Sequence, residues 1–407
     1  MTTNYFSYTA SNGIQYIHLP TNRAVAYAIA LLNTGTRDEL NEEHGLAHFI
    51  EHIMFKGTKR RNSFQILNRI ESVGGELDAY TTKEDTCLIA SFLPQYFDRA
   101  FDLISDILFN SVFPEQQINL EKSVIIDEIN SYNDSPSELI YDDFEELVFN
   151  GHPLARNILG NKISIERFNQ KMIQEFCART YNTNQIVLCT AGNINYDKSL
   201  KFFQKYFEKI PASYRNWKRK RFKKYLPSEK IIKKNTHQAH CMIGNIAYSF
   251  NHKDRLGMHV LNNILGIGST SRLNMSLRER NGLVYYIESG YTTYSDTGVL
   301  YIYFNTEKPK LTKAIKLVKE EFKKLREIPL TSQQLKKAKQ QLHGQFAFSF
   351  DNQETYTLNV AKSFLVYKKI DSFESILEEL DSIKPEDIQR IACELLDENK
   401  LSVLIYE

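Results

Sequence analysis

The sequence contains the stretch His48-Phe49-Ile50-Glu51-His52, from which both its chemistry and its fold can be predicted. On a helix, residues four positions apart lie one above the other on one face, so His48 and His52 can hold one metal ion together. Glu51, three positions after His48, lies on the same side. Imidazole is a good zinc ligand, and a carboxylate beside a zinc-bound water can accept its proton. Two ligands and a general base therefore fit within about one and a half helical turns.

A five-residue motif can also be a polar edge on an amphipathic helix, so its surroundings have to decide. A catalytic zinc site uses three protein ligands, and two histidines leave one ligand to find. The segment Glu121-Lys122-Ser123-Val124-Ile125-Ile126-Asp127-Glu128 offers two carboxylates on one helix face, since seven residues make about two turns. Glu128 lies 128 − 52 = 76 residues after His52.

The composition predicts a globular protein with two domains. The chain has 407 residues, of which 42% are hydrophobic and 12% aromatic, enough for a large core and about 200 residues per domain. The 51 basic and 49 acidic residues nearly cancel, so no global field recruits nucleic acid or a membrane surface. The one local exception is the basic stretch at 214–234.

The cysteines predict a reducing compartment. Five are present, which is an odd number, and they are widely spaced without a Cys-x-x-Cys pair, as is typical of reduced thiols in the cytoplasm. Residues 1–16 carry no recognisable export or organelle signal. The apolar run at 24–32 is too short for a membrane span, which needs roughly 20 residues, and predicts a buried strand.

The first half is predicted to combine short strands with helices. A helix at 43–55 bears the histidines. The other elements expected are helices at 63–72, 94–110, 114–132 and 136–148, an extended segment at 76–93 and strands at 24–32 and 186–191.

The second half repeats this plan. We expect strands at 239–248, 285–294 and 299–305 and helices at 253–265, 271–280, 311–326 and 332–348. Pairing Gln117 with Gln334 at the start of corresponding helices puts Glu128 opposite Gln345, and the second half has no His-x-x-Glu-His. Each half is therefore expected to be an antiparallel sheet with helices packed against one face, giving an α+β fold of two homologous domains.

Between the halves, Pro211 and Pro227 flank the run Lys218-Arg219-Lys220-Arg221. Because this run is short and the rest of the chain is neutral, it favours a solvated linker over a nucleic-acid arm.

Two runs, Gly35-Thr36-Arg37-Asp38-Glu39 and His44 to Thr58, resemble the pitrilysin, insulysin and mitochondrial processing peptidase family of zinc metallopeptidases. His-x-x-Glu-His is the inverted form of the more familiar His-Glu-x-x-His arrangement. The resemblance extends over the whole chain, including Gly74-Gly75, His152-Pro153-Leu154 and Ile158-Leu159-Gly160. The length matches the short bacterial branch, in which one chain contains an active half and an inactive half.

The resemblance implies roles for five residues. His48, His52 and Glu128 would bind zinc, one ion per chain. Glu51 would deprotonate the zinc-bound water, which attacks a peptide carbonyl, and then pass the proton to the leaving amine. Glu121 would orient a ligand through a hydrogen bond. The alternative for Glu121 is an exposed helix carboxylate.

Other histidines and glycines fit a site less well. His44, His48 and His52 form a series whose ends lie about 12 Å apart, too far for one ion to bridge, so His44 is expected to be at the helix N-terminus or behind a ligand. The pair His237 and His240 lies in a predicted strand context. The stretch Gly266-Ile267-Gly268-Ser269 favours a loop over a nucleotide site.

The segment Asp78-Ala79-Tyr80-Thr81 stands where family members commonly carry Asn-Ala-x-Thr. By resemblance, Asp78, Ala79, Tyr80 and Thr81 form an edge strand that pairs with the substrate backbone and accepts many sequences. Asp78 departs from the usual Asn, which bears on substrate choice and not on the chemistry.

A segment of the second half, Leu277 to Tyr285, resembles the family's Arg/Tyr segment. Arg278 would grip substrate carbonyls and Tyr285 would donate a hydrogen bond to the oxyanion of the tetrahedral intermediate. The alternatives are a surface ion pair for Arg278 and a strand aromatic for Tyr285.

These inferences assign residues 1–212 to a catalytic zinc-binding domain, 213–226 to a basic linker and 227–407 to a homologous domain without metal. The expected function is zinc-dependent endopeptidase cleavage of peptides or unfolded segments in an enclosed chamber. The short branch implies a homodimer in which Arg278 and Tyr285 serve the partner's zinc site. The alternatives are a non-catalytic partner subunit and a dedicated processing peptidase for one precursor peptide.

Overall fold

The computed structural model describes residues 5–407, which form two compact units. The first unit comprises residues 5–130, 158–219 and 348–373, and the second comprises 131–157, 220–347 and 374–407. These units cross the domain boundaries predicted from the sequence, because each half of the chain contributes a helix to the unit built mainly by the other half. Residues 1–4 of the segment 1–16, in which no targeting signal is predicted, lie outside the described residues.

The first unit is built on a six-stranded sheet with the order β1-β2-β6-β3-β5-β4. Its strands are β1 (Phe6–Thr9), β2 (Gln15–Pro20), β3 (Ala26–Leu32), β4 (Glu76–Thr81), β5 (Thr86–Phe92) and β6 (Ile186–Gly192). All pairs are antiparallel except β2 with β6. The sheet therefore departs from the prediction of a purely antiparallel sheet in this one pair. The extended segment predicted at 76–93 is the hairpin of β4 and β5, in which β4 forms the outer edge.

Strand β3 shows how the sequence builds the core on both faces of this sheet. Ala26, Ala28 and Ala30 point to one face, where small side chains let helices approach closely. Ile29 and Leu31 point to the opposite face and are also fully buried. The strand predicted from the continuous apolar run is therefore confirmed, because both faces are covered.

The first half of the chain contributes seven α-helices to the first unit. They are α1 (Leu46–Ile53), α2 (Ser63–Glu71), α3 (Phe97–Asn110), α4 (Glu115–Asn133), α6 (Lys162–Arg167), α7 (Gln170–Thr180) and α8 (Tyr196–Phe207). The predicted helix at 43–55 begins later, because residues 41–43 form a separate 3-10 turn.

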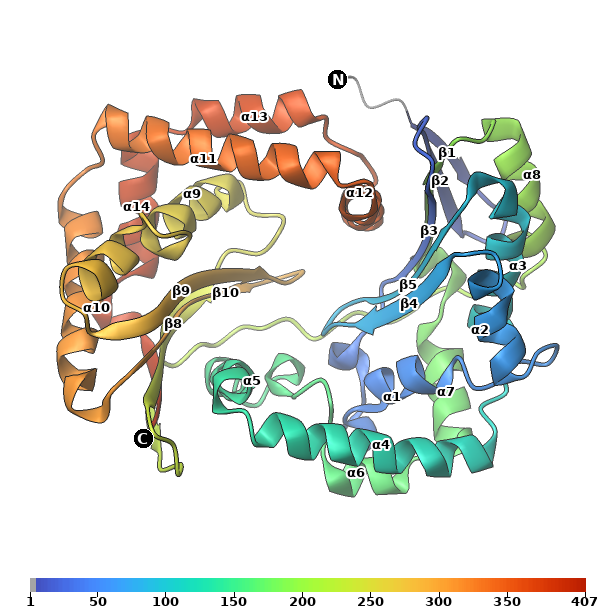
Figure 1. The fold of residues 1–407 in the computed structure, drawn as a ribbon, viewed down its shortest axis with the longest axis horizontal. Helices are drawn as coiled ribbons and strands as arrows, with labels where there is room; N and C mark the ends of the chain where they lie inside the picture. Colours follow the sequence, from blue (N-terminus) through green and yellow to red (C-terminus); the bar gives the residue numbers. More distant parts are fainter. Residues whose placement is uncertain (1–4) are drawn as a thin grey trace. The chain divides into compact units, whose positions relative to one another are not determined.

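A helix from the second half of the chain, α12 (Gln353–Tyr367), covers the other face of the first sheet. Val360 and Ala361 are buried against Ile29 and Leu31 of β3. Figure 1 shows α12 on the side of this sheet opposite α3 and α8. The prediction of helices on one face only is therefore wrong for this unit, since a sheet rich in apolar side chains on both faces needs two helical layers.

The second unit contains a five-stranded sheet with the order β7-β11-β8-β10-β9. Its strands are β7 (Glu229–Ile232), β8 (Ala239–Ala247), β9 (Val284–Thr293), β10 (Gly298–Thr306) and β11 (Ser402–Tyr406). Only β7 and β11 run parallel. Its helices are α9 (Arg255–Gly266), α10 (Leu311–Glu327), α11 (Ser332–Asp351), α13 (Phe373–Ser382) and α14 (Pro385–Leu395), and the helix predicted at 271–280 contains a π-helical turn at Asn274–Glu279.

The first half of the chain contributes one helix, α5 (Pro136–Val148), to the second unit, where it packs on the sheet. Ile140, Phe144 and Val148 are buried against Met242 and Leu404. Figure 1 shows α5 and α10 on opposite sides of the sheet. Three tyrosine hydroxyls also donate to carboxylates across this contact, in the pairs Tyr141–Glu288, Tyr294–Glu145 and Tyr406–Asp143.

The basic linker is not wholly solvated as predicted. Arg219 donates to the Asp38 carboxylate, with its Nη2 atom 2.7 Å from Oδ2, and Arg215 donates to the Asn33 carbonyl. Lys218 and Arg221 are exposed. These two partly buried arginines hold the linker to the loop before α1, because Asp38, itself buried, needs a cation as its partner.

The predicted α+β class with two similar units is confirmed. In the described part of the chain, no helix combines the length and the apolar character that a bilayer crossing demands.

Candidate metal centre

The start of α1 is fixed by Glu39, a residue for which the sequence predicted no role. The Glu39 carboxylate accepts hydrogen bonds from the backbone N–H groups of Gly45 and Ala47, at 3.0 and 2.9 Å. Gly45 has φ +90°, and a Cβ there would lie 2.7 Å from the Leu159 carbonyl oxygen. An acidic residue six positions before the N-cap residue Gly45 is the local signal for this cap. The anchored start sets the direction in which the following turns point.

Helix α1 buries one side and presents the histidines on the other. Phe49, Ile50 and Ile53 are fully buried in the core of the first unit, whereas Glu51 and His52 are partly exposed. This division follows from the helical period, which places the three apolar residues on one stripe.

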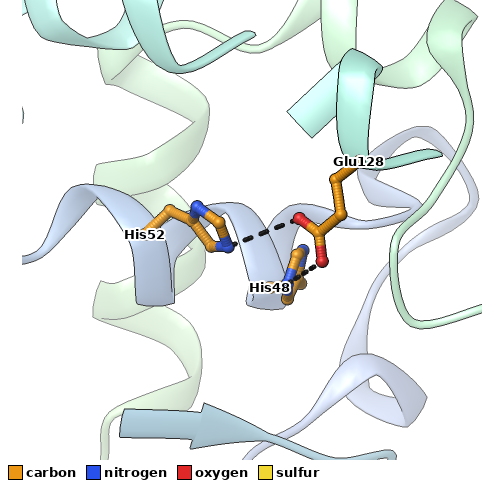
Figure 2. A group of neighbouring side chains, drawn as sticks. All are labelled: His48, His52 and Glu128. Carbon is orange, nitrogen blue, oxygen red and sulfur yellow. Dashed lines mark ion pairs between the residues drawn. The ribbon is translucent and has the colours of Figure 1, made fainter. Parts of the chain in front are cut away.

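The two imidazoles face a single carboxylate on α4. His48 Nε2 lies 3.9 Å from Glu128 Oε1, and His52 Nε2 lies 3.6 Å from Glu128 Oε2. Figure 2 shows the two rings on successive turns of α1 with the Glu128 carboxylate directed at both. The three ligand atoms lie within 4.8 Å of one another, the one such group among residues 5–407. Both separations exceed a hydrogen bond, so the atoms converge without bonding to each other.

This donor set fits zinc. Two imidazole nitrogens and one carboxylate oxygen are a common set of protein ligands for catalytic zinc. Burial lowers the pKa of His48 to about 4, with a further lowering by His52, so His48 is neutral at pH 7 and its Nε2 can offer a lone pair. The three residues could therefore hold a zinc ion in the space that they face.

Glu121, which the resemblance suggested as a partner of a ligand, lies next to His52. Its Oε1 atom is 3.0 Å from His52 Nδ1, and its Oε2 atom is 2.9 Å from Lys56 Nζ. Glu121 is buried and not an exposed helix carboxylate. A carboxylate on Nδ1 favours the tautomer in which Nδ1 carries the proton and Nε2 faces Glu128.

Glu51 lies beside the group on the same helix. Burial raises the pKa of its carboxyl, whereas the Thr81 hydroxyl and His52 lower it and Asp78 raises it. A carboxylate with a raised pKa is a stronger base than an ordinary glutamate, which suits it to accept a proton. Thr81 belongs to β4, so the end of this strand lies close to Glu51.

Strand β4 offers an unpaired edge. It pairs with β5 on one side, and no other described strand pairs with it. Because the Thr82 N–H donates to the Asp85 carbonyl, the antiparallel alternation turns the Ala79 N–H to the open side. The Asp78 carboxylate accepts a hydrogen bond from this N–H, at 2.8 Å. Tyr80 points to the face that α12 covers.

Arg278 and Tyr285 belong to the second unit. Arg278 lies in the π-helical turn and Tyr285 near the start of β9, the outer strand of the second sheet. The guanidinium carbon lies 5.8 Å from the centroid of the Tyr285 ring, and that side chain is 77% exposed. The two residues thus lie together on one surface of their unit.

The other histidines weighed as ligands lie elsewhere. His44 precedes the N-cap residue of α1, and its Nδ1 atom lies 3.3 Å from the Asn161 amide nitrogen. His240 lies in β8, with its Nδ1 atom 2.9 Å from the Tyr303 hydroxyl.

In the second unit, amides connect the corresponding helices. The Gln345 amide on α11 donates to Asn263 Oδ1 on α9 at 3.1 Å, and Asn263 Nδ2 donates to Gln341 Oε1 at 2.9 Å. Gln345 is the residue that the repeat sets opposite Glu128. Neutral amides thus link these two helices by hydrogen bonds.

Comparisons with known proteins agree over the whole chain. The family model described as insulinase, peptidase family M16, matches residues 14–162, and that described as the peptidase M16 inactive domain matches residues 167–342. A curated relative from Bacillus subtilis, named an uncharacterized zinc protease, is 31% identical over 98% of this chain and 97% of its own length. Another of that description from Rickettsia felis is 31% identical over 100% of this chain and 98% of its own length.

Solved structures show the same fold. A protease from Helicobacter pylori has a TM-score of 0.90 at 21% identity and covers 100% of both chains. A peptidase M16 inactive domain protein from Pseudomonas fluorescens has a TM-score of 0.91 at 17% identity, over 99% of this chain and 97% of that one. With the full-length relatives and the two matching models, the chain belongs to peptidase family M16, the pitrilysin and insulysin family.

Proposed function

We propose that this chain is a zinc-dependent endopeptidase that hydrolyses peptides or unfolded segments. The observation that carries the proposal is the convergence of His48, His52 and Glu128, with Glu51 on the same helix. We propose that these three residues hold one zinc ion per chain. A bound zinc ion supplies Lewis acidity, which makes water a stronger acid and polarises a carbonyl group.

In this proposal Glu51 moves the proton. A Glu51 carboxylate oxygen accepts a proton from the attacking water and then delivers it to the nitrogen of the leaving amine. The raised pKa of Glu51 supports this role, because the carboxyl must both take up and release a proton. Glu121 holds the Nδ1 proton of His52.

The test of the proposal is metal analysis combined with a peptide-library digest. We expect one zinc per chain in the wild type and in Glu51→Gln, with cleavage by Glu51→Gln lower by about 10²- to 10⁴-fold. Glu42→Gln, a change at an exposed acid near α1, is the matched control and should keep activity. No zinc in the wild type, or wild-type cleavage by Glu51→Gln, would overturn the proposal. Zinc without cleavage by the wild type would favour a non-catalytic subunit.

We propose that the unpaired edge of β4, at Asp78, Ala79, Tyr80 and Thr81, pairs with the substrate backbone. The unpaired outer side of β4 and the approach of Thr81 to Glu51 support this, and a substrate carbonyl would replace the Asp78 carboxylate as the acceptor of the Ala79 N–H. Edge pairing uses backbone groups and thus accepts many sequences. We therefore expect cleavage of an unfolded protein but not of its folded form. An enclosed chamber, which would exclude folded proteins, predicts the same result.

By resemblance to the family, Arg278 and Tyr285 would bind substrate carbonyls and the oxyanion, and would do so in the partner subunit of a homodimer. Their proximity supports a joint role. Mixing an Arg278→Ala chain with a Glu51→Gln chain should restore part of the activity. No recovery despite confirmed exchange of subunits would contradict the sharing of sites.

We also propose a cytoplasmic location. The five cysteines are free thiols, and four of them have a pKa raised by burial, which suits a reducing compartment.

A further inference from the structure

Lys56 lies beside the candidate metal centre and has no role in the proposed chemistry. It follows α1 by three residues, and its Nζ atom lies 2.9 Å from Glu121 Oε2. The other oxygen of Glu121 is 3.0 Å from His52 Nδ1. Lys56, Glu121 and His52 thus form a chain of contacts that ends at a proposed zinc ligand.

We propose that Lys56 is a positioning residue that orients His52 for zinc through Glu121. The inference rests on the proposed zinc function. Lys56 grips one carboxylate oxygen of Glu121 and thereby turns the other toward His52 Nδ1. In this arrangement His52 Nδ1 donates a hydrogen bond to Glu121, and the lone pair on Nε2 faces Glu128.

The burial of Glu121 is the first reason for this role. Its side chain is 7% exposed, whereas that of Lys56 is 31% exposed. A buried carboxylate with a single hydrogen bond can rotate about its terminal torsion, which has broad minima. A second, charge-assisted contact at the other oxygen removes that freedom.

The anchoring of the Lys56 backbone is the second reason. The Lys56 N–H donates to the Ile53 carbonyl at 3.0 Å, and the Val112 N–H donates to the Gly57 carbonyl at 3.1 Å. The Thr58 hydroxyl donates to the Asp106 carboxylate at 2.8 Å. The loop that carries Lys56 is therefore fixed to α3 and to the segment between α3 and α4. The ammonium starts from a set position, unlike that of a surface lysine on a free loop.

The test measures zinc affinity of the full chain by competition with a chelator. Lys56→Met should weaken zinc binding by about 10- to 100-fold, the range found when outer partners of metal ligands are removed. Lys56→Arg, which keeps the charge, should retain most of the affinity. Lys59→Met is the matched control, because Lys59 is exposed in the same loop, and it should bind zinc as the wild type does.

A double mutant shows whether Lys56 acts through Glu121. Glu121→Gln should weaken zinc binding by itself, and adding Lys56→Met to it should cause no further loss. Full additivity of the two losses would overturn the inference. Melting of the metal-free variants identifies a general loss of stability, and a lowered melting temperature with unchanged zinc affinity would also overturn it.

The outcomes separate this inference from the proposed function. If the wild type binds zinc and Lys56→Met binds it equally well, the role of Lys56 is refuted and the zinc peptidase proposal stands. If the wild type binds no zinc, both are refuted.

Discussion

At the residue scale, the candidate site depends on side chains that can be identified from the sequence but whose orientations cannot. His48 and His52 are placed by helical spacing alone. Their Nε2 atoms converge on Glu128 only because α4 passes in front of α1, and Glu121 sets which nitrogen of His52 faces inward. A ligand set can be predicted from residue types, whereas the tautomer of each ligand is decided by its neighbours.

Glu39 gives a residue-scale prediction about the start of the histidine helix. Glu39→Ala should lower the free energy of unfolding by about 1–3 kcal/mol, because the N–H groups of Gly45 and Ala47 lose a buried acceptor. Urea unfolding of the metal-free chain measures this change. Glu42→Ala, at an exposed acid in the preceding turn, should cost less than about 0.5 kcal/mol. Equal costs for the two variants would contradict a capping role for Glu39.

At the scale of elements, the two units exchange helices. Helix α12 covers one face of the first sheet and α5 covers one face of the second, although each comes from the other half of the sequence. Hydrophobic periodicity predicts the bounds of α5, at 136–148, but no helix was predicted at the position of α12. It does not predict which sheet such helices cover, because an apolar stripe fits any apolar face of similar shape.

Val360 tests how much α12 contributes to stability. Val360→Ala removes two methyl groups from a buried position and should lower the free energy of unfolding by about 2 kcal/mol, including the cavity left behind. Chemical unfolding followed by circular dichroism provides the measurement. The control is Val124→Ala on α4, where the valine is 51% exposed and little change is expected. A cost at Val360 no larger than at Val124 would mean that α12 does not stabilise the sheet.

At the scale of the whole molecule, the chain interleaves two units of one α+β plan, and among residues 5–407 a group that could hold a metal ion occurs in the first unit alone. In the first unit, α1 and α4 present ionisable ligands. In the second, Asn263 on α9 and Gln345 on α11 meet through neutral amides. The contact that joins α1 to α4 directly is the one between His52 and Glu121, so the two units keep the same pair of helices with different side-chain chemistry between them.

The burial of His18 should make the stability of the molecule depend on pH. The ring is fully buried between Thr190 and the Ile194 carbonyl, and burial lowers its pKa to about 4. Below pH 6.5 the unfolded chain binds a proton that the folded chain refuses, so stability falls as the pH drops from about 6.5 to 4. The loss at pH 4 should reach at most about 3 kcal/mol.

Urea unfolding at several pH values measures this dependence. His18→Gln should reduce the slope between pH 6.5 and 4, and His237→Gln, at an exposed histidine, should leave it unchanged. An identical slope in the wild type and His18→Gln would refute the assignment to His18.

Much of the local structure could be predicted from the sequence. The period of apolar residues predicted most elements from β3 to α5 and from β8 to α11 within a few residues, with α5 matched at both ends. It did not predict the strands β1, β2, β7 and β11 or the helices α6, α7, α8, α12, α13 and α14. It merged the β4 and β5 hairpin into one segment, because Thr82 to Asp85 lack the usual glycine of a tight turn. It also treated Arg215 and Arg219 as solvated, since a charged run carries no sign of a buried acidic partner.

The sequence by itself determined the α+β plan, its internal repeat, the histidine helix and the carboxylates suited to complete a zinc group. These depend on spacing along one or two elements, where the helical and strand periods fix which side chains share a face. Only the tertiary structure decided that Lys56 reaches Glu121, that Glu39 caps α1 and that α12 closes the first sheet. Those contacts join residues without a common period, and their formation depends on how several packed elements share one core.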